Sequence, residues 1–130
     1  MAYCNLANIY SSMGDNNSAI VLYKKAIEIY PHYAMAYNNL GIIYATQGDQ
    51  EKAIAMFDQA IKIDPTYRSA YIKLAQIYKT LGREEELELL YRKAAANHVD
   101  LFGAYYYLGN LYSNVHKDKE VIRSPSGDRD

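Results

Sequence analysis

The 130-residue chain lacks most of the features that mark disulfide-bonded domains, metal sites and enzymes. Its single cysteine, Cys4, cannot form an internal disulfide and is compatible with a reducing compartment. None of its histidines (His32, His98 and His116) has a second ligand at metal-binding spacing. A Gly-rich phosphate loop and a nucleophile elbow are also missing. We therefore expect no cofactor, no metal site and no catalytic residues, and predict that the chain is not an enzyme.

Charge of one sign and long apolar runs are missing too. The chain has 14 basic and 15 acidic side chains, which gives a formal net charge of −1. This balance offers no field that would recruit nucleic acid or an anionic membrane. No apolar run approaches the roughly 20 residues that span a bilayer, and the residues after Met1 do not have the layout of a secretory signal. We expect a cytoplasmic protein without a nucleic-acid or membrane partner.

What the sequence does contain is an internal repeat. Four tyrosines, Tyr3, Tyr37, Tyr71 and Tyr105, follow one another at intervals of 34 residues. The same interval relates Leu6, Leu40, Leu74 and Leu108; Ala7, Gly41, Ala75 and Gly109; Tyr10, Tyr44, Tyr78 and Tyr112; Gly14, Gly48 and Gly82; Ala19, Ala53 and Leu87; Tyr23, Phe57 and Tyr91; Ala26, Ala60 and Ala94; and Pro31 and Pro65. A period of this length indicates an array of stacked units.

Each unit predicts two helices. From Ala34 to Thr46 the apolar residues recur at spacings of three and four, which is the stripe of an amphipathic helix. A second such stripe runs from Ala53 to Ile61. Between them, Gly48 suits the left-handed conformation that ends a helix, and Asp49 can cap the next one. The unit is therefore expected to be a helical hairpin that stacks on its neighbours to form one continuous core.

These residues and their spacing resemble the tetratricopeptide repeat. The resemblance implies an all-α fold, a right-handed superhelical α-solenoid of about three and a half repeats. We expect one array over residues 1–122, with repeats at 1–33, 34–67 and 68–101 and a partial repeat or capping helix at 102–122. Residues 123–130 contain no apolar side chain and are expected to form a polar tail.

The resemblance also implies a function and a site. In this family the first helices of the repeats line a concave groove that binds an extended segment of a partner protein. Asparagine suits such a groove because its amide can pair with both the N–H and the C=O of a peptide backbone. The family's contact positions correspond here to Asn5, Asn8, Met35, Asn38, Asn39, Ile42, Ile72, Lys73, Gln76, Tyr106, Tyr107 and Asn110.

Several alternatives stay open within the family. Asn5 and Asn39 occupy one position in successive units, which resembles the asparagine ladder of O-linked N-acetylglucosamine transferases. The carboxylate clamp that holds the C-terminal tail of heat-shock chaperones is disfavoured, because of its three cations only Lys73 has a counterpart. The chain is alternatively a self-assembly module that forms homo-oligomers through its terminal helices. Since Met1 coincides with the start of the first repeat, an accessory segment of a larger enzyme or signalling protein is the third alternative.

Overall fold

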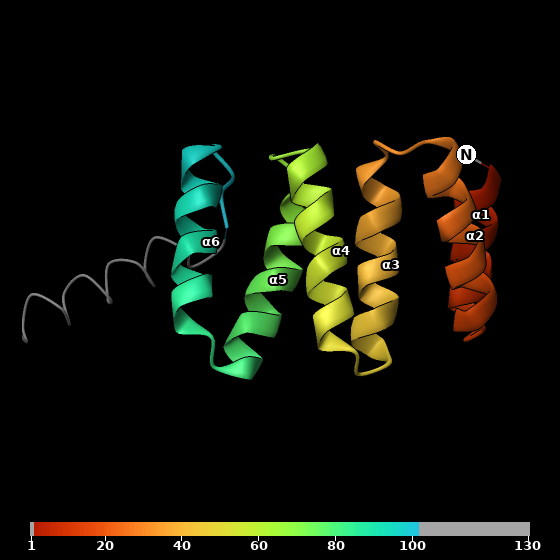
Figure 1. The fold of residues 1–130 in the computed structure, drawn as a ribbon, viewed down its shortest axis with the longest axis horizontal. Helices are drawn as coiled ribbons and strands as arrows, with labels where there is room; N and C mark the ends of the chain where they lie inside the picture. The colour runs from red at the N-terminus through yellow and green to blue at the C-terminus, as the bar shows by residue number, and fades with distance from the viewer. Residues whose placement is uncertain (1, 102–130) are drawn as a thin grey trace, which may run out of the picture.

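The computed structural model describes residues 2–101; Met1 and residues 102–130 lie outside the described part. The regular structure of residues 2–101 is entirely helical. Its elements are α1 (Ala2–Ser12), α2 (Asn16–Ile29), α3 (Ala34–Thr46), α4 (Gln50–Ile63), α5 (Arg68–Leu81) and α6 (Glu84–Ala96). They stand side by side in one elongated row (Figure 1). The predicted all-α solenoid of paired helices is confirmed, whereas the predicted capping helix and polar tail fall outside the described residues.

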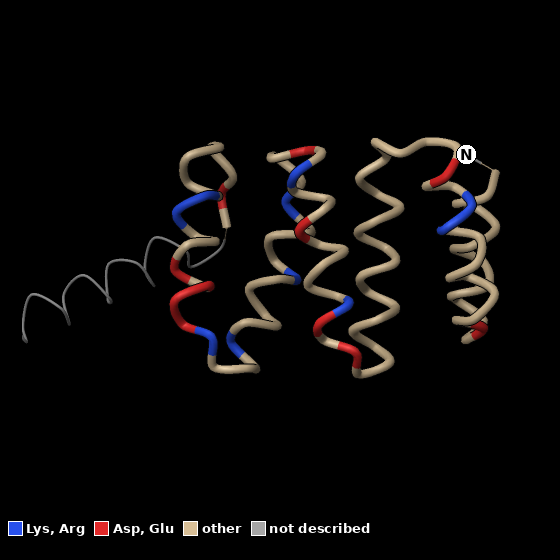
Figure 2. The backbone as a smooth tube through the Cα atoms, viewed as in Figure 1, with Lys and Arg blue, Asp and Glu red and all other residues tan. Residues whose placement is uncertain are grey.

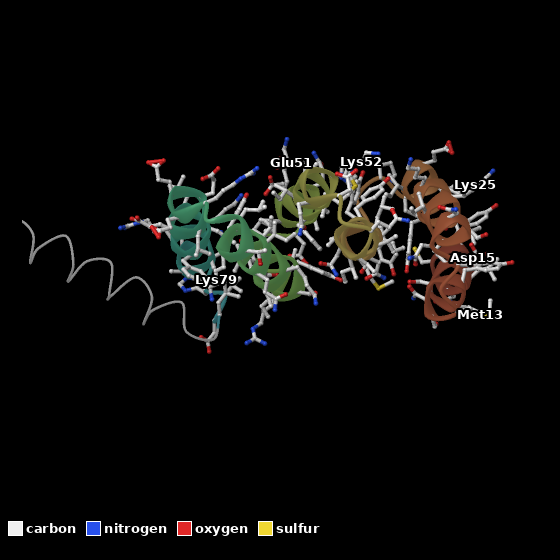
Figure 3. The ribbon with its side chains drawn as sticks, turned by 90° about the horizontal axis from the view of Figure 1, so that it is seen from below. Met13, Asp15, Lys25, Glu51, Lys52 and Lys79 are labelled. Atoms are coloured by element: carbon white, nitrogen blue, oxygen red, sulfur yellow. The ribbon has the colours of Figure 1, made fainter. Side chains whose placement is uncertain are left out.

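The helices form two layers. Within each unit the two helices pack against each other, and successive units meet where α2 contacts α3 and where α4 contacts α5. Seen along the perpendicular view, α1, α3 and α5 lie on one side and α2, α4 and α6 on the other (Figure 3). Lys79 of α5 projects on the first side, and Glu51 and Lys52 of α4 project on the second. We call α1, α3 and α5 the first layer and the other three helices the second layer.

The turns inside the hairpins repeat with the sequence. Gly14 and Gly48 have φ values of +82° and +85°, the left-handed conformation that closes the preceding helix. The next residue in each case, Asp15 or Asp49, caps the following helix by accepting a hydrogen bond of 3.2 Å from a backbone N–H. In the third unit Arg83 occupies this position and provides no side-chain cap. Three glutamates in the first turn of α6 instead favour the positive end of its dipole.

The links between hairpins repeat in the first two units and change in the third. The Tyr37 hydroxyl donates to the Pro31 carbonyl at 3.4 Å, and the Tyr71 hydroxyl donates to the Pro65 carbonyl at 2.7 Å. Each bond ties the start of a helix to the loop before it. After α6, where no proline follows, the helix ends one residue earlier and the chain turns through His98, whose φ is +59°. The third unit therefore leaves its second helix by a different path.

A small residue and an aromatic ring recur in the core of each unit. Ala7, Gly41 and Ala75 occupy one position in α1, α3 and α5, and the rings of the second helices are Tyr23, Phe57 and Tyr91, all at most 3% exposed. In the second unit the two are in close contact, since a Cβ added to Gly41 would lie 2.9 Å from Phe57 Cε1. Interiors packed at crystal density have no free volume that would absorb such an overlap. Gly41 therefore sets how closely α3 and α4 approach.

We predict that Gly41→Ala destabilises the protein despite the better helix propensity of alanine. The propensity gain is about 1 kcal/mol, whereas overpacking a buried contact costs about 1–3 kcal/mol. The melting temperature should therefore fall. In a Phe57→Leu background, where the ring is gone, the same substitution should be neutral or stabilising. A higher melting temperature for Gly41→Ala alone would show that the ring can move aside.

Candidate functional site

Two hollows lie on the first layer, one between α1 and α3 and one between α3 and α5. The first hollow has a volume of about 270 Å³ and is lined by Asn8, Ser11, Ser12, Tyr23, Asn39, Ile42 and Ile43. The second hollow has a volume of about 230 Å³ and is lined by Ile42, Ala45, Thr46, Phe57, Lys73, Gln76 and Ile77. Adding 34 to each residue number of the first set gives the second set, member for member. The two hollows are thus one structural site that the repeat presents twice.

The first hollow is polar and uncharged. The Oδ1 atom of Asn8 accepts hydrogen bonds from the Tyr23 hydroxyl and from Nδ2 of Asn39, at 3.2 Å in the second case. Burial raises the pKa of Tyr23, and the Asn39 amide partly offsets this by stabilising the phenolate. The hydroxyl therefore stays protonated near neutral pH and remains a donor. This network fixes both amides and leaves Asn8 Nδ2 and Asn39 Oδ1 without partners among the described residues.

The second hollow is more apolar than the first, and its lining includes the Gln76 amide and one cation. Phe57 replaces Tyr23 at its base, and Ile42 replaces Asn8 on its wall, so the amide network has no counterpart here. Lys73 stands where the first hollow has Asn39, and it is half-buried. Within residues 2–101 the ammonium of Lys73 forms no ion pair. The second hollow therefore offers apolar contact and an available positive charge.

Two features connect the hollows. Ile42 belongs to both, because it follows Asn8 by one repeat and precedes Gln76 by one repeat. Each hollow also has a hydroxyl that bonds within its own helix, since Ser12 donates to the Asn8 carbonyl at 2.7 Å and Thr46 to the Ile42 carbonyl at 2.9 Å. These hydroxyls satisfy backbone acceptors and present mainly their carbon atoms to the hollow.

Charge is divided between the layers. Helices α1 and α3 contain no charged residue, and α5 contains only the basic residues Arg68, Lys73 and Lys79. All acidic residues of the described helices are on α2, α4 and α6 (Figure 2). The Arg68 guanidinium is already engaged, donating to the Asp100 carbonyl at 2.7 Å. The first layer is consequently neutral at α1 and positive at α5.

The structure gathers five of the predicted groove residues. Asn8, Asn39, Ile42, Lys73 and Gln76 line the two hollows. The sequence-based prediction missed the aromatic base of each hollow, which comes from the second layer. The signal was present, because Tyr23 and Phe57 are themselves one repeat apart and each follows a hollow residue by 15 positions.

The other predicted groove residues lie elsewhere. Asn5 is exposed on α1. Met35 is half-buried, and its sulfur atom accepts a hydrogen bond from the Tyr33 hydroxyl at 3.7 Å. Ile72 lines a separate hollow of about 180 Å³ together with Lys79 and Leu101. Predictions for Tyr106, Tyr107 and Asn110 fall outside the described residues.

Asn38 does not have the exposure that a groove residue needs. Its side chain is 3% exposed, and its Nδ2 atom donates to Ser69 Oγ at 3.3 Å between α3 and α5. Its Oδ1 atom is buried and has no hydrogen-bond partner. The same position in the first unit holds Cys4, which is fully buried. This position of the helix turns inward, so Asn38 serves the contact between units rather than the groove.

The helical pairs, their stacking and the repeated hollows define a solenoid built from hairpin units. A tetratricopeptide repeat family profile matches residues 1–66, and a second profile of the same description matches residues 69–96. The chain belongs to the tetratricopeptide repeat family. Arrays of this family are protein-interaction modules and are typically non-catalytic, and the chain is a scaffold of this kind.

Among solved structures, the chain is similar to one described as the crystal structure of MamA. The identity is 29%, the TM-score is 0.69, and the match covers 75% of this chain. It covers 57% of the MamA chain, so the present chain spans less than two thirds of that protein. No curated protein matches the chain.

Two further findings concern residues 2–101. None of the helices in this range has the length and apolar character needed to cross a membrane. Nor do three or more histidine, cysteine, aspartate or glutamate side chains come together there in a group that could hold a metal ion.

We predict that Asn38→Leu leaves the free energy of unfolding unchanged or raises it by about 1 kcal/mol. The substitution has nearly the same shape and removes a buried carbonyl oxygen that has no partner, whose desolvation costs about 1–3 kcal/mol. The lost bond to Ser69 is long and offsets part of the gain. Chemical denaturation would measure the change. Asn38→Asp, which buries a charge at the same place, should be strongly destabilising.

Proposed function

We propose that the first layer binds an extended segment of a partner protein along the two hollows. The observation that carries this proposal is the repetition of one hollow, residue for residue, at an interval of 34. An extended chain presents side chains at regular intervals, so a regularly repeated hollow is suited to it. Asn8 and Asn39 add free amide groups that can pair with a peptide backbone. These amides are held in place before binding, which lowers the entropy cost of association.

The test is binding of a diverse peptide array, with free and blocked C-termini, to the full chain and to Asn39→Ala. We expect selective binding whose affinity falls about three- to tenfold in the variant, because one or two hydrogen bonds worth about 0.5–1.5 kcal/mol each are lost. The melting temperature should stay nearly the same, since Asn39 is on the surface of the array.

The matched control is Asn17→Ala. Asn17 is exposed on α2, outside both hollows, and this variant should bind like the unchanged chain. Equal losses in the two variants, or binding that is indifferent to Asn39, would place the peptide elsewhere. Dependence on a free C-terminus would show that a terminal carboxylate is the feature recognised.

A second candidate function is association between two copies through α1. Leu6 and Ile9 of this helix are 42% and 54% exposed, and Met13, just after its end, is 66% exposed. Leu40 and Ile43, the counterparts of Leu6 and Ile9 one repeat later, are only 2% and 3% exposed. Because α1 has no charged residue, two such faces can meet without electrostatic repulsion. The C-terminal helix, through which the sequence also suggested association, lies outside the described residues.

We predict that, if this face mediates association, the mass measured by sedimentation rises with protein concentration and Ile9→Gln abolishes the rise. Burying one isoleucine contributes about 1.5–3 kcal/mol, which a glutamine would forfeit. Ile9 is already exposed in the single chain, so the variant should keep its helicity. A chain that stays monomeric at every concentration excludes this candidate and leaves the groove proposal untouched.

A further inference from the structure

The two hollows have the same place in the repeat but opposite chemistry. Asn8 becomes Ile42, Tyr23 becomes Phe57 and Asn39 becomes Lys73, and each of these changes removes an uncharged hydrogen-bonding group. One change goes the other way, because Ile42 of the first hollow becomes Gln76 in the second. The network of the first hollow is lost all the same, so the two hollows favour different ligand side chains.

We infer that the groove selects its partner by a short pattern: an uncharged hydrogen-bonding side chain in the first hollow, and an aliphatic side chain next to a carboxylate in the second. This inference rests on the proposed function. It adds to that function the chemistry of the segment that is bound and the way the segment lies along the array.

The first hollow specifies its side chain by hydrogen bonding. Asn8 Nδ2 is a free donor and Asn39 Oδ1 is a free acceptor, because the remaining atoms of this pair are used in the bond between them. The amide of asparagine or glutamine, or the hydroxyl of serine or threonine, can satisfy such groups. An aliphatic side chain would leave them buried without partners, which costs about 1–3 kcal/mol per group. A charged side chain would find no opposite charge there.

The second hollow specifies its side chain by apolar contact and by charge. Ile42, Phe57 and Ile77 supply apolar walls, and the Thr46 hydroxyl is already bonded to its own helix. An aliphatic side chain against these walls loses its contact with water, while the Gln76 amide, which also lines the hollow, is exposed and can stay hydrated. Lys73 stands beside this hollow with no acidic residue anywhere on α1, α3 or α5 to neutralise it. A carboxylate of the ligand would supply the missing partner.

The repeat also sets the separation of the two ligand side chains. Packed helices lie about 8–10 Å apart. A peptide in the extended polyproline II conformation rises ~3.1 Å per residue and, with three residues per turn, points every third side chain the same way. Side chains in the two hollows should therefore be about three residues apart. Since the positive charge of the first layer is confined to α5, the neutral part of the ligand lies towards α1 and its acidic part towards α5.

The test uses the repeat to design its variants. Asn39→Lys and Lys73→Asn each introduce the residue that the same position has in the neighbouring unit, so the fold already accommodates both. The probe is a display library of random peptides about ten residues long, selected on the full chain and on each variant. The charge control is Lys25→Asn, which removes the same charge from the second layer, on the side away from Lys79 (Figure 3). Thermal melts confirm that each variant is folded.

On the unchanged chain we expect enriched peptides to pair an aliphatic residue and its neighbouring aspartate or glutamate with an uncharged polar residue about three positions away. Lys73→Asn should lower the affinity of these peptides about tenfold and remove the preference for the acid. Asn39→Lys should create a new preference for an acid at the polar position. Lys25→Asn should change neither preference.

Three outcomes would overturn the inference, and they separate it from the proposal beneath it. Peptides that bind in an Asn39-dependent way but show the same pattern on every variant would leave groove binding intact and refute the selection by hollows. A loss of the acid preference in Lys25→Asn equal to that in Lys73→Asn would assign the preference to overall charge. No enrichment on the unchanged chain would refute both the inference and the proposed function.

Discussion

The close contact between Gly41 and Phe57 in the second unit is the constraint on which the rest of the array depends. No side-chain atom could be added to the glycine without displacing the ring. The ring is held at 0% exposure, yet its edge also forms the base of the second hollow. The same contact therefore fixes the distance between the layers and the depth of the surface site. A groove built on core residues in this way is rigid because the core is rigid.

The division of charge between the layers follows from the same architecture. The outer face of the second layer is in water, where charged side chains of both signs stay solvated. Examples are the exposed pairs Arg92–Glu88 and Lys52–Asp49. The first layer contains no acidic residue in α1, α3 or α5. Nothing about folding demands this, since exposed positions such as Asn5, Asn8 and Gln76 would accept a carboxylate. The absence of acidic residues from this layer therefore supports the proposal that it binds a partner.

Much of the fold could be predicted from the sequence, because the repeat presents the same evidence several times. Gly14 and Gly48, Asp15 and Asp49, and Pro31 and Pro65 mark the same helix ends in successive units, and the structure has those ends where the pattern predicts them. The orientation of single side chains was less accessible. Asn38 and Asn39 are adjacent and chemically identical, but one faces Ser69 in the interior and the other faces Asn8 at the surface. A rotation of about 100° per residue separates them, and only the packing of α3 against α5 determines which one is buried.

The hollows could not be predicted from a list of positions on the first helices alone. Their bases come from Tyr23 and Phe57 in the second layer. Which polar atoms each hollow offers depends on hydrogen bonds that residue spacing does not reveal, such as that between Asn8 and Tyr23. The sequence predicted twelve groove residues, and five of them line the two hollows. The structure adds which of them act together, and that is the information from which ligand chemistry can be argued.

Ile42 has a consequence for how such an array changes over time. Because Ile42 lines both hollows, a single substitution there changes the shape and polarity of two neighbouring surface sites at once. Asn39 and Lys73, by contrast, each belong to one hollow and can vary alone. Successive hollows therefore do not vary independently of each other. A substitution of a residue that lines only one hollow changes that hollow alone, whereas a substitution of Ile42 changes both.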